Sequence, residues 1–69
     1  MAVNYAYIYA EIDTETGECV GVFTRTSEIS NPALIPLSVY DPEYIGKYYI
    51  NGAWYEDAEG TIPWQSALL

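Results

Sequence analysis

The dipeptide Asn51-Gly52, flanked on both sides by aromatic residues, constrains the fold of this chain more than any other feature of its sequence. Asn-Gly suits the two central positions of a type I′ turn, which joins antiparallel strands through a two-residue loop. A loop of this length fixes the register of four cross-strand pairs: Ile50–Ala53, Tyr49–Trp54, Tyr48–Tyr55 and Lys47–Glu56. Aromatic and opposite-charge pairs each contribute about 0.2–1 kcal/mol, so every pair favours the same hairpin. The sequence therefore predicts a hairpin over residues 47–56, with its aromatic residues mainly as hairpin core.

A second pattern, strict alternation, runs through residues 4–13 and is typical of a strand. One face is a stripe of Tyr5, Tyr7, Tyr9 and Glu11, and the other is aliphatic, with Ala6, Ile8, Ala10 and Ile12. The two faces suit different neighbours. We therefore expect one face of this strand to meet a partner molecule, and the three tyrosines are candidate contacts.

The next segment continues the β pattern after a short loop that ends at Gly17, where a positive φ closes the turn. Residues 18–26 are rich in β-formers and predict the second strand of this first hairpin. Gly21 lies inside that strand. A glycine at such a position indicates a bulge, or the close approach of another backbone or ring.

Proline residues indicate where the third strand and the one helical turn lie. Residues 34–40 predict a short third strand, and Pro36 puts it at a sheet edge because proline cannot donate to a ladder. Asp41 and Pro42 suit the N-cap and first position of one helical turn, which Gly46 would end.

The predicted fold is therefore a small, mainly β single domain. It consists of an antiparallel sheet of about five strands built on two hairpins, with at most one short helical turn. We divide the chain into a β domain, residues 1–59, and an apolar C-terminal docking tail, residues 60–69. Pro63 bars the tail from a central strand, and Trp64, Leu68 and Leu69 are its candidate docking residues.

Size and composition limit how such a domain is stabilised. A chain of 69 residues buries only about 60% of its unfolded surface. Its single cysteine allows no internal disulfide, and the absence of histidine excludes the usual zinc sites. Oligomerisation or docking onto a larger assembly remains as the stabilising device, so we expect a protein partner, either another subunit or a second copy.

Charge narrows the class of partner further. Ten acidic residues face only Arg25 and Lys47, which gives a net charge of -8. Such a chain repels phosphate backbones and anionic lipid, so we expect neither nucleic acid nor membrane as a partner. Basic proteins, including those that bind DNA, remain open as partners.

Catalytic chemistry has few candidate residues here. Histidine is absent, and Cys19 has no basic neighbour in sequence to stabilise a thiolate. The carboxylates gather in turns, as is typical of a solvated surface. Residues 57–62 partly match a calcium loop, but Tyr55 stands where the first ligand belongs and the final glutamate is missing. We therefore expect no enzyme activity, catalytic residue, metal or cofactor.

A resemblance to one family rests on several short segments, namely Glu18-Cys19-Val20-Gly21-Val22, Leu34-Ile35-Pro36-Leu37, Tyr40-Asp41, Tyr44-Ile45-Gly46-Lys47-Tyr48-Tyr49 and Asn51-Gly52-Ala53-Trp54-Tyr55-Glu56. This layout, over about residues 3–56, resembles short proteins encoded among the tail genes of tailed bacteriophages and prophages. Many of those proteins continue into a charged or coiled-coil tail, whereas this sequence ends with Trp64 and two leucines. The resemblance implies a virion-associated role near the tail or its fibres, with no catalytic residues to carry over.

The leading hypothesis is a non-enzymatic phage structural or accessory protein, made in the host cytoplasm and located in the virion, which docks on tail or capsid components or self-assembles. One alternative is a small acidic inhibitor that mimics DNA and blocks a host DNA-handling enzyme. A second is a carbohydrate-binding module that uses Tyr48, Trp54 and Tyr55.

Overall fold

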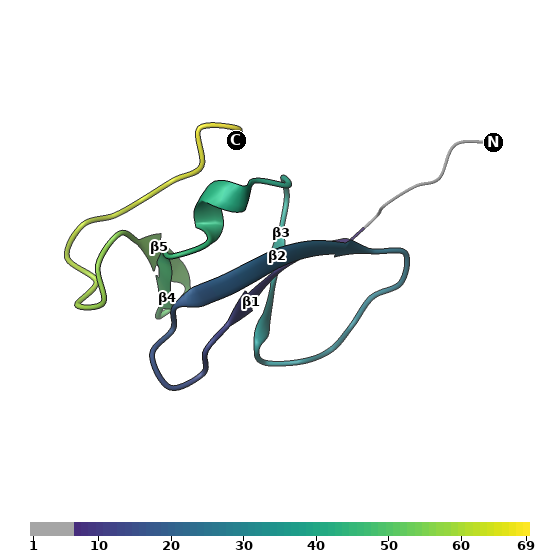
Figure 1. Ribbon diagram of the computed structural model, residues 1–69, viewed down its shortest axis with the longest axis horizontal. Helices are drawn as coiled ribbons and strands as arrows, with labels where there is room; N and C mark the ends of the chain where they lie inside the picture. The colour runs from purple at the N-terminus through teal and green to yellow at the C-terminus, as the bar shows by residue number, and fades with distance from the viewer. Residues whose placement is uncertain (1–6) are drawn as a thin grey trace.

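The computed structural model describes residues 7–69 and is mainly β, as predicted. Its elements are β1 (Tyr7–Ile12), β2 (Cys19–Arg25), β3 (Leu34–Leu37), the single 3-10 turn η1 (Pro42–Tyr44), β4 (Tyr48–Ile50) and β5 (Ala53–Tyr55) (Figure 1). The five strands of this region form two antiparallel sheets, one with the order β2-β1-β3 and one with β4 beside β5. The start of the predicted first strand, including Tyr5, lies outside the described residues.

The β1–β2 hairpin confirms both glycine predictions for this part of the chain. Gly17 has a φ of 81°, and its N–H donates to the Asp13 carbonyl across the loop at 2.6 Å. Glu11 pairs with Gly21, whereas Ile12 pairs with Cys19, so the register shifts by one residue there. This shift is the bulge that the strand-interior glycine indicates.

The third strand lies at a sheet edge, as Pro36 predicts. β3 pairs with the side of β1 opposite to β2, and Pro36 lies across from Tyr9. The strand ends at Leu37 rather than at the predicted Tyr40. Asp41 then caps η1 as predicted, because its Oδ1 accepts the Glu43 N–H at 2.9 Å and Pro42 begins the turn.

The second hairpin has the predicted register in its three innermost pairs: Ile50–Ala53, Tyr49–Trp54 and Tyr48–Tyr55. Asn51 and Gly52 both have positive φ, 50° and 85°, as a type I′ turn requires. The strands end before the fourth predicted pair. The Lys47 carbonyl accepts from Cys19, and the Glu56 N–H donates to Ile62 instead.

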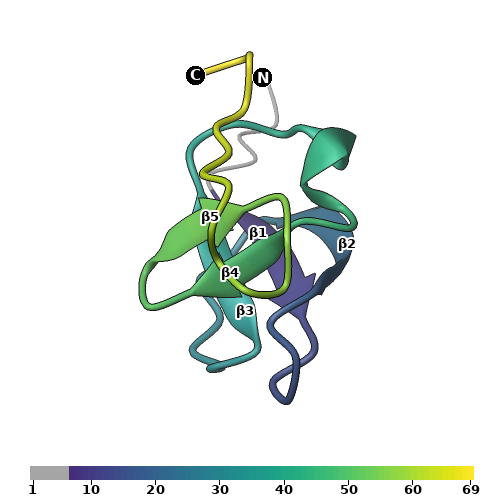
Figure 2. The ribbon, with the colours of Figure 1, turned by 90° about the vertical axis from the view of Figure 1, so that its left-hand side faces the viewer.

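Backbone hydrogen bonds join the two sheets edge to edge beside the first hairpin loop. Cys19 N donates to the Lys47 carbonyl at 2.8 Å, and Tyr49 N donates to the Gly17 carbonyl at 2.9 Å. Glu18 and Tyr48 form an isolated bridge between these contacts. Figure 2 shows the β4–β5 hairpin in front of the larger sheet, at the end where β1 and β2 are linked.

The core lies between the aliphatic face of β1, η1 and the second hairpin. Ala10, Cys19 and Tyr44 are its buried centre. Partly buried side chains pack around them: Ile12, Val22, Ile35, Leu37, Val39, Trp54 and Trp64. The Tyr44 ring meets Trp54 and Trp64 edge-on, each with a centroid distance of 4.9 Å, a favourable aromatic geometry. No helix within residues 7–69 is long and apolar enough to cross a membrane.

Candidate docking surface

The tyrosine stripe of β1 lies partly in the interior, which differs from the expectation that it is a contact face. Tyr9 is only 2% exposed, and its hydroxyl oxygen accepts the Ile29 N–H at 2.8 Å. Its ring lies 5.9 Å from that of Phe23 on the adjacent strand. Because Ala10 on the opposite face is also fully buried, both faces of β1 are covered at this point. Tyr9 therefore offers no surface to a partner, Tyr7 is half-buried, and Tyr5 lies outside the described residues.

The aromatic residues of the second hairpin are half-buried and contact neighbours within the chain. The Tyr49 and Trp54 rings are 5.1 Å apart, and Trp54 also reaches Tyr44. On the other face of the hairpin, the loop around Gly60 packs against Ile50 and Tyr55, which lie close to its backbone. These contacts involve Tyr49, Trp54 and Tyr55, while Tyr48 is half-buried and pairs with Tyr55 across the hairpin.

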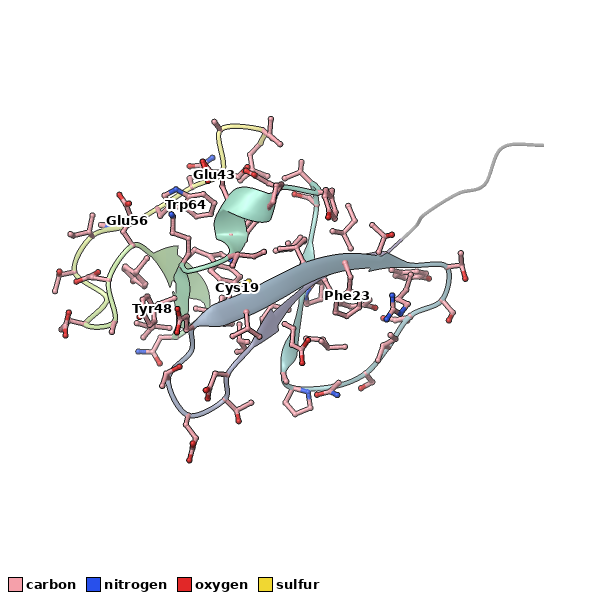
Figure 3. The ribbon with its side chains drawn as sticks, viewed as in Figure 1. Cys19, Phe23, Glu43, Tyr48, Glu56 and Trp64 are labelled. Atoms are coloured by element: carbon pink, nitrogen blue, oxygen red, sulfur yellow. The ribbon has the colours of Figure 1, made fainter. Side chains whose placement is uncertain are left out.

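The predicted docking tail is anchored to the domain before it reaches the two leucines. Trp64 N donates to the Trp54 carbonyl at 3.0 Å, and Pro63 forms a bridge with Tyr55. The Trp64 ring packs on Tyr44, and Lys47 Nζ lies 5.1 Å from the centroid of the same ring. Figure 3 shows Trp64 beside η1, the turn that carries Glu43. Trp64 therefore completes the core of the chain itself.

Ser66 is the residue of the candidate docking surface that sequence reasoning missed. It is only 4% exposed, and its Oγ donates to Asp41 Oδ2 at 2.5 Å. The same Oγ accepts the Leu68 N–H at 3.1 Å, and the Ser66 carbonyl accepts the Leu69 N–H at 3.3 Å. Asp41 thus caps η1 with one oxygen and holds the tail with the other. The only signal in the sequence is that a capping carboxylate has a second oxygen to satisfy.

This anchor brings exposed apolar residues to one end of the molecule. Tyr40 directly precedes Asp41 and is 51% exposed, while Leu68 and Leu69 follow Ser66 and are 60% and 59% exposed. Figures 1 and 2 both place the end of the chain next to the connection between β3 and η1. We call these three residues the terminal apolar surface. Among residues 7–69, the other large apolar side chains that are this exposed are Val20, Ile45 and Ile62.

Both basic side chains lie over aromatic rings, whereas many acids gather in loops. The guanidinium carbon of Arg25 lies 4.3 Å from the centre of the Phe23 ring. Lys47 Nζ lies over the Trp64 ring at the longer distance of 5.1 Å. The acidic loops are the β1–β2 connection, with Asp13, Glu15 and Glu18, and the segment after β5, with Glu56, Asp57 and Glu59. The domain therefore carries a strongly negative net charge, much of it in these two loops.

The titratable groups with shifted pKa values have structural explanations. Burial raises the pKa of the Cys19 thiol, whose Sγ donates to the Gly21 carbonyl at 3.3 Å. Burial, and secondarily the nearby Asp41, also raises the pKa of Tyr44. The hydrogen bond from the Thr61 hydroxyl, with those from the Thr61 and Ile62 N–H groups, lowers the pKa of Asp57. Asp57 therefore stabilises the loop of residues 57–62 through these hydrogen bonds. Within residues 7–69 no cluster of three metal-ligating side chains is present.

The fold and this surface together define a class: a small, two-sheet β domain that presents apolar residues at one end. Comparisons with models of protein families, with curated proteins and with solved structures gave no match.

Proposed function

We propose that this chain is a non-catalytic assembly protein that docks onto another protein through the terminal apolar surface of Tyr40, Leu68 and Leu69. The resemblance to short tail-region proteins of bacteriophages suggests a virion component as that partner. One observation carries the proposal. The buried Asp41–Ser66 hydrogen bond holds two leucines in place while leaving most of their surface in water.

Energetics support this interpretation. Full burial of a leucine side chain is worth about 1.5–3 kcal/mol, and the domain leaves that gain unused at both positions. A surface that is held rigid before binding also loses less conformational entropy on docking. The arrangement around Ser66 therefore suits an interface that a partner completes.

The net charge of the chain indicates what kind of protein can bind it. A net charge of -8 disfavours acidic partners and favours a protein with an apolar centre and basic or neutral surroundings. Glu43, which is exposed on η1, lies near the tail and adds negative charge beside this surface (Figure 3).

Under this proposal the chain is encoded by a phage or prophage, and the test uses virions of that phage. Quantitative mass spectrometry of purified particles should detect the wild-type protein and should lose it for the double variant Leu68→Ser/Leu69→Ser. Ile62→Ser is the matched control, because Ile62 is an apolar residue of similar exposure outside this surface. Particles that lack the wild-type protein, or that retain the double variant, would refute the proposal.

The acidic inhibitor is the second candidate, and the two acidic loops favour it. They lie beside the two strands of the second hairpin, because Gly17 in the first loop bonds Tyr49 of β4 and the second loop follows β5 directly. Binding to basic DNA-handling proteins that weakens as salt rises, and that survives the double leucine substitution, would favour this role. The carbohydrate-binding alternative has less support, because the hairpin aromatics already contact one another and the loop at Gly60.

A further inference from the structure

The two outer edges of the three-stranded sheet differ in their capacity to pair. On the β3 side of β1, the Ile12 N–H donates to the Ala33 carbonyl. On the β2 side, the Asp13 N–H donates to the Glu18 carbonyl. Backbone groups alternate along a strand, so Tyr9 bonds towards β2 and its neighbour Ala10 towards β3. Pro36, opposite Tyr9, therefore turns its nitrogen outward, and having no N–H it blocks the β3 edge.

The β2 edge has no such block. By the same alternation, Phe23 and Arg25 bond to β1, and Val22 and Thr24 direct their N–H and carbonyl groups outward. The beginning of this edge is occupied, since Cys19 bonds residues 46 and 47. The open stretch therefore begins after the bulge and runs to Arg25.

Gly21, at the start of this stretch, lies at the bulge, but the bulge does not require a glycine there. Its φ lies outside the left-handed region, and a Cβ added there would meet nothing within 4 Å. A glycine in a strand costs about 0.5–1 kcal/mol relative to alanine, so its presence suggests that something else approaches it. The open space lies on the face shared with its pairing partner Glu11.

We propose that two copies of this chain pair antiparallel through their β2 edges, with the two-fold axis at Phe23. In this register Val22 of one copy bonds Thr24 of the other, and the two Phe23 rings lie side by side. Arg25 of each copy then lies over Gly21 of the other, next to Glu11. A register shifted towards Cys19 would collide with residues 46 and 47.

Charge complementarity supports the second copy as the occupant, despite the acidity of the chain. The acidic β1–β2 loop lies at the opposite end of β2 from Arg25, so antiparallel pairing places the two acidic loops far apart. In the single chain Arg25 Nη1 donates to the Thr24 carbonyl at 2.9 Å and so caps the open edge. On pairing, this carbonyl accepts the Val22 N–H of the second copy, and the guanidinium turns to Glu11.

This inference extends the proposed assembly role by naming one partner, but it uses the β2 edge and not the terminal apolar surface. Sedimentation equilibrium of the full chain, from micromolar to millimolar concentration, should show the mass rising from 7.7 kDa towards twice that value. Thr24→Pro should keep the protein monomeric and folded, because it removes an outward N–H and leaves the bonds to β1 intact. Near-UV circular dichroism verifies the fold.

A charge reversal tests the register. Arg25→Glu should weaken the dimer about tenfold or more, and Glu11→Arg/Arg25→Glu should restore it, since the pair is remade with opposite polarity. Leu68→Ser/Leu69→Ser should leave the dimer unchanged. A wild-type protein that is monomeric throughout, or a dimer that is insensitive to Thr24→Pro, would overturn the inference. So would a dimer that the leucine substitutions abolish, because the terminal apolar surface would then be the interface.

Discussion

Replacing Gly17 by alanine should destabilise the domain more than the same change at Gly21 or Gly46, because the joint between the sheets passes through this residue. Its φ of 81° lies in the left-handed region, which costs a residue with a Cβ about 1–2 kcal/mol. The added Cβ would also lie 2.8 Å from the Tyr49 carbonyl oxygen, which is backbone and cannot rotate away. The backbone shift that relieves this contact strains the hydrogen bond from Tyr49 N to the Gly17 carbonyl.

The magnitude follows from adding these two effects. Relief of overpacking costs about 1–3 kcal/mol, so the total loss is about 2–5 kcal/mol. A domain of 69 residues has a free energy of unfolding of about 3–10 kcal/mol, so this change removes a large part of it. At about 4–8 °C per kcal/mol for a domain of this size, Tm should fall by roughly 10 °C or more.

Two matched substitutions separate the cost of the left-handed backbone from the cost of the steric contact. Gly46→Ala meets the same backbone cost at a φ of 92° without any steric contact, so it should lose about 1–2 kcal/mol. Gly21→Ala meets neither cost and should be neutral or stabilising by up to about 1 kcal/mol. Thermal and urea unfolding at low micromolar concentration, where dimerisation does not contribute, gives the three values. Equal stability of Gly17→Ala and Gly21→Ala would refute the reasoning.

Two further predictions concern titratable groups. Burial raises the pKa of Cys19, so the folded protein should react with thiol reagents far more slowly than the urea-unfolded chain at neutral pH; equal rates would show that the thiol is accessible. The pKa of Asp57 is lowered in the folded state, so its contribution to stability is present above the pKa of the unfolded chain and is lost as pH falls through the folded value. Asp57→Asn should therefore flatten the acidic part of the curve of unfolding free energy against pH, and an unchanged curve would contradict the assignment.

The elements that the sequence predicts correctly are those set by local rules. Asn51-Gly52 specifies its turn and three cross-strand pairs, and Pro36 identifies an edge strand because proline lacks a donor. Asp41 and Pro42 identify the short helical turn. In each case the physical cause lies within a few residues along the chain, so it can be read without knowing the tertiary structure.

The features that could not be predicted depend on contacts between distant segments. The burial of Tyr9 depends on the loop at Ile29, which is 20 residues away, and the placement of Ser66 depends on Asp41, 25 residues away. Alternation along β1 shows that two faces exist, but it does not show which of them the rest of the chain covers. The way in which the two sheets meet likewise depends on the backbone hydrogen bond between Cys19 and Lys47, which lie far apart in the sequence.

Under the proposed docking role, the anchor at Asp41 would couple docking to folding. Ser66 and Trp64 belong to the structure that surrounds Tyr44, so a partner that holds Leu68 and Leu69 also restrains the core residues next to them. A ligand at a concentration of 100 times its Kd stabilises the folded state by about 2.7 kcal/mol. That gain is comparable to the loss expected for Gly17→Ala, although the two sites lie in different parts of the fold. Under the proposed docking role, a destabilised variant of this small domain therefore regains a large part of the lost stability once it is assembled.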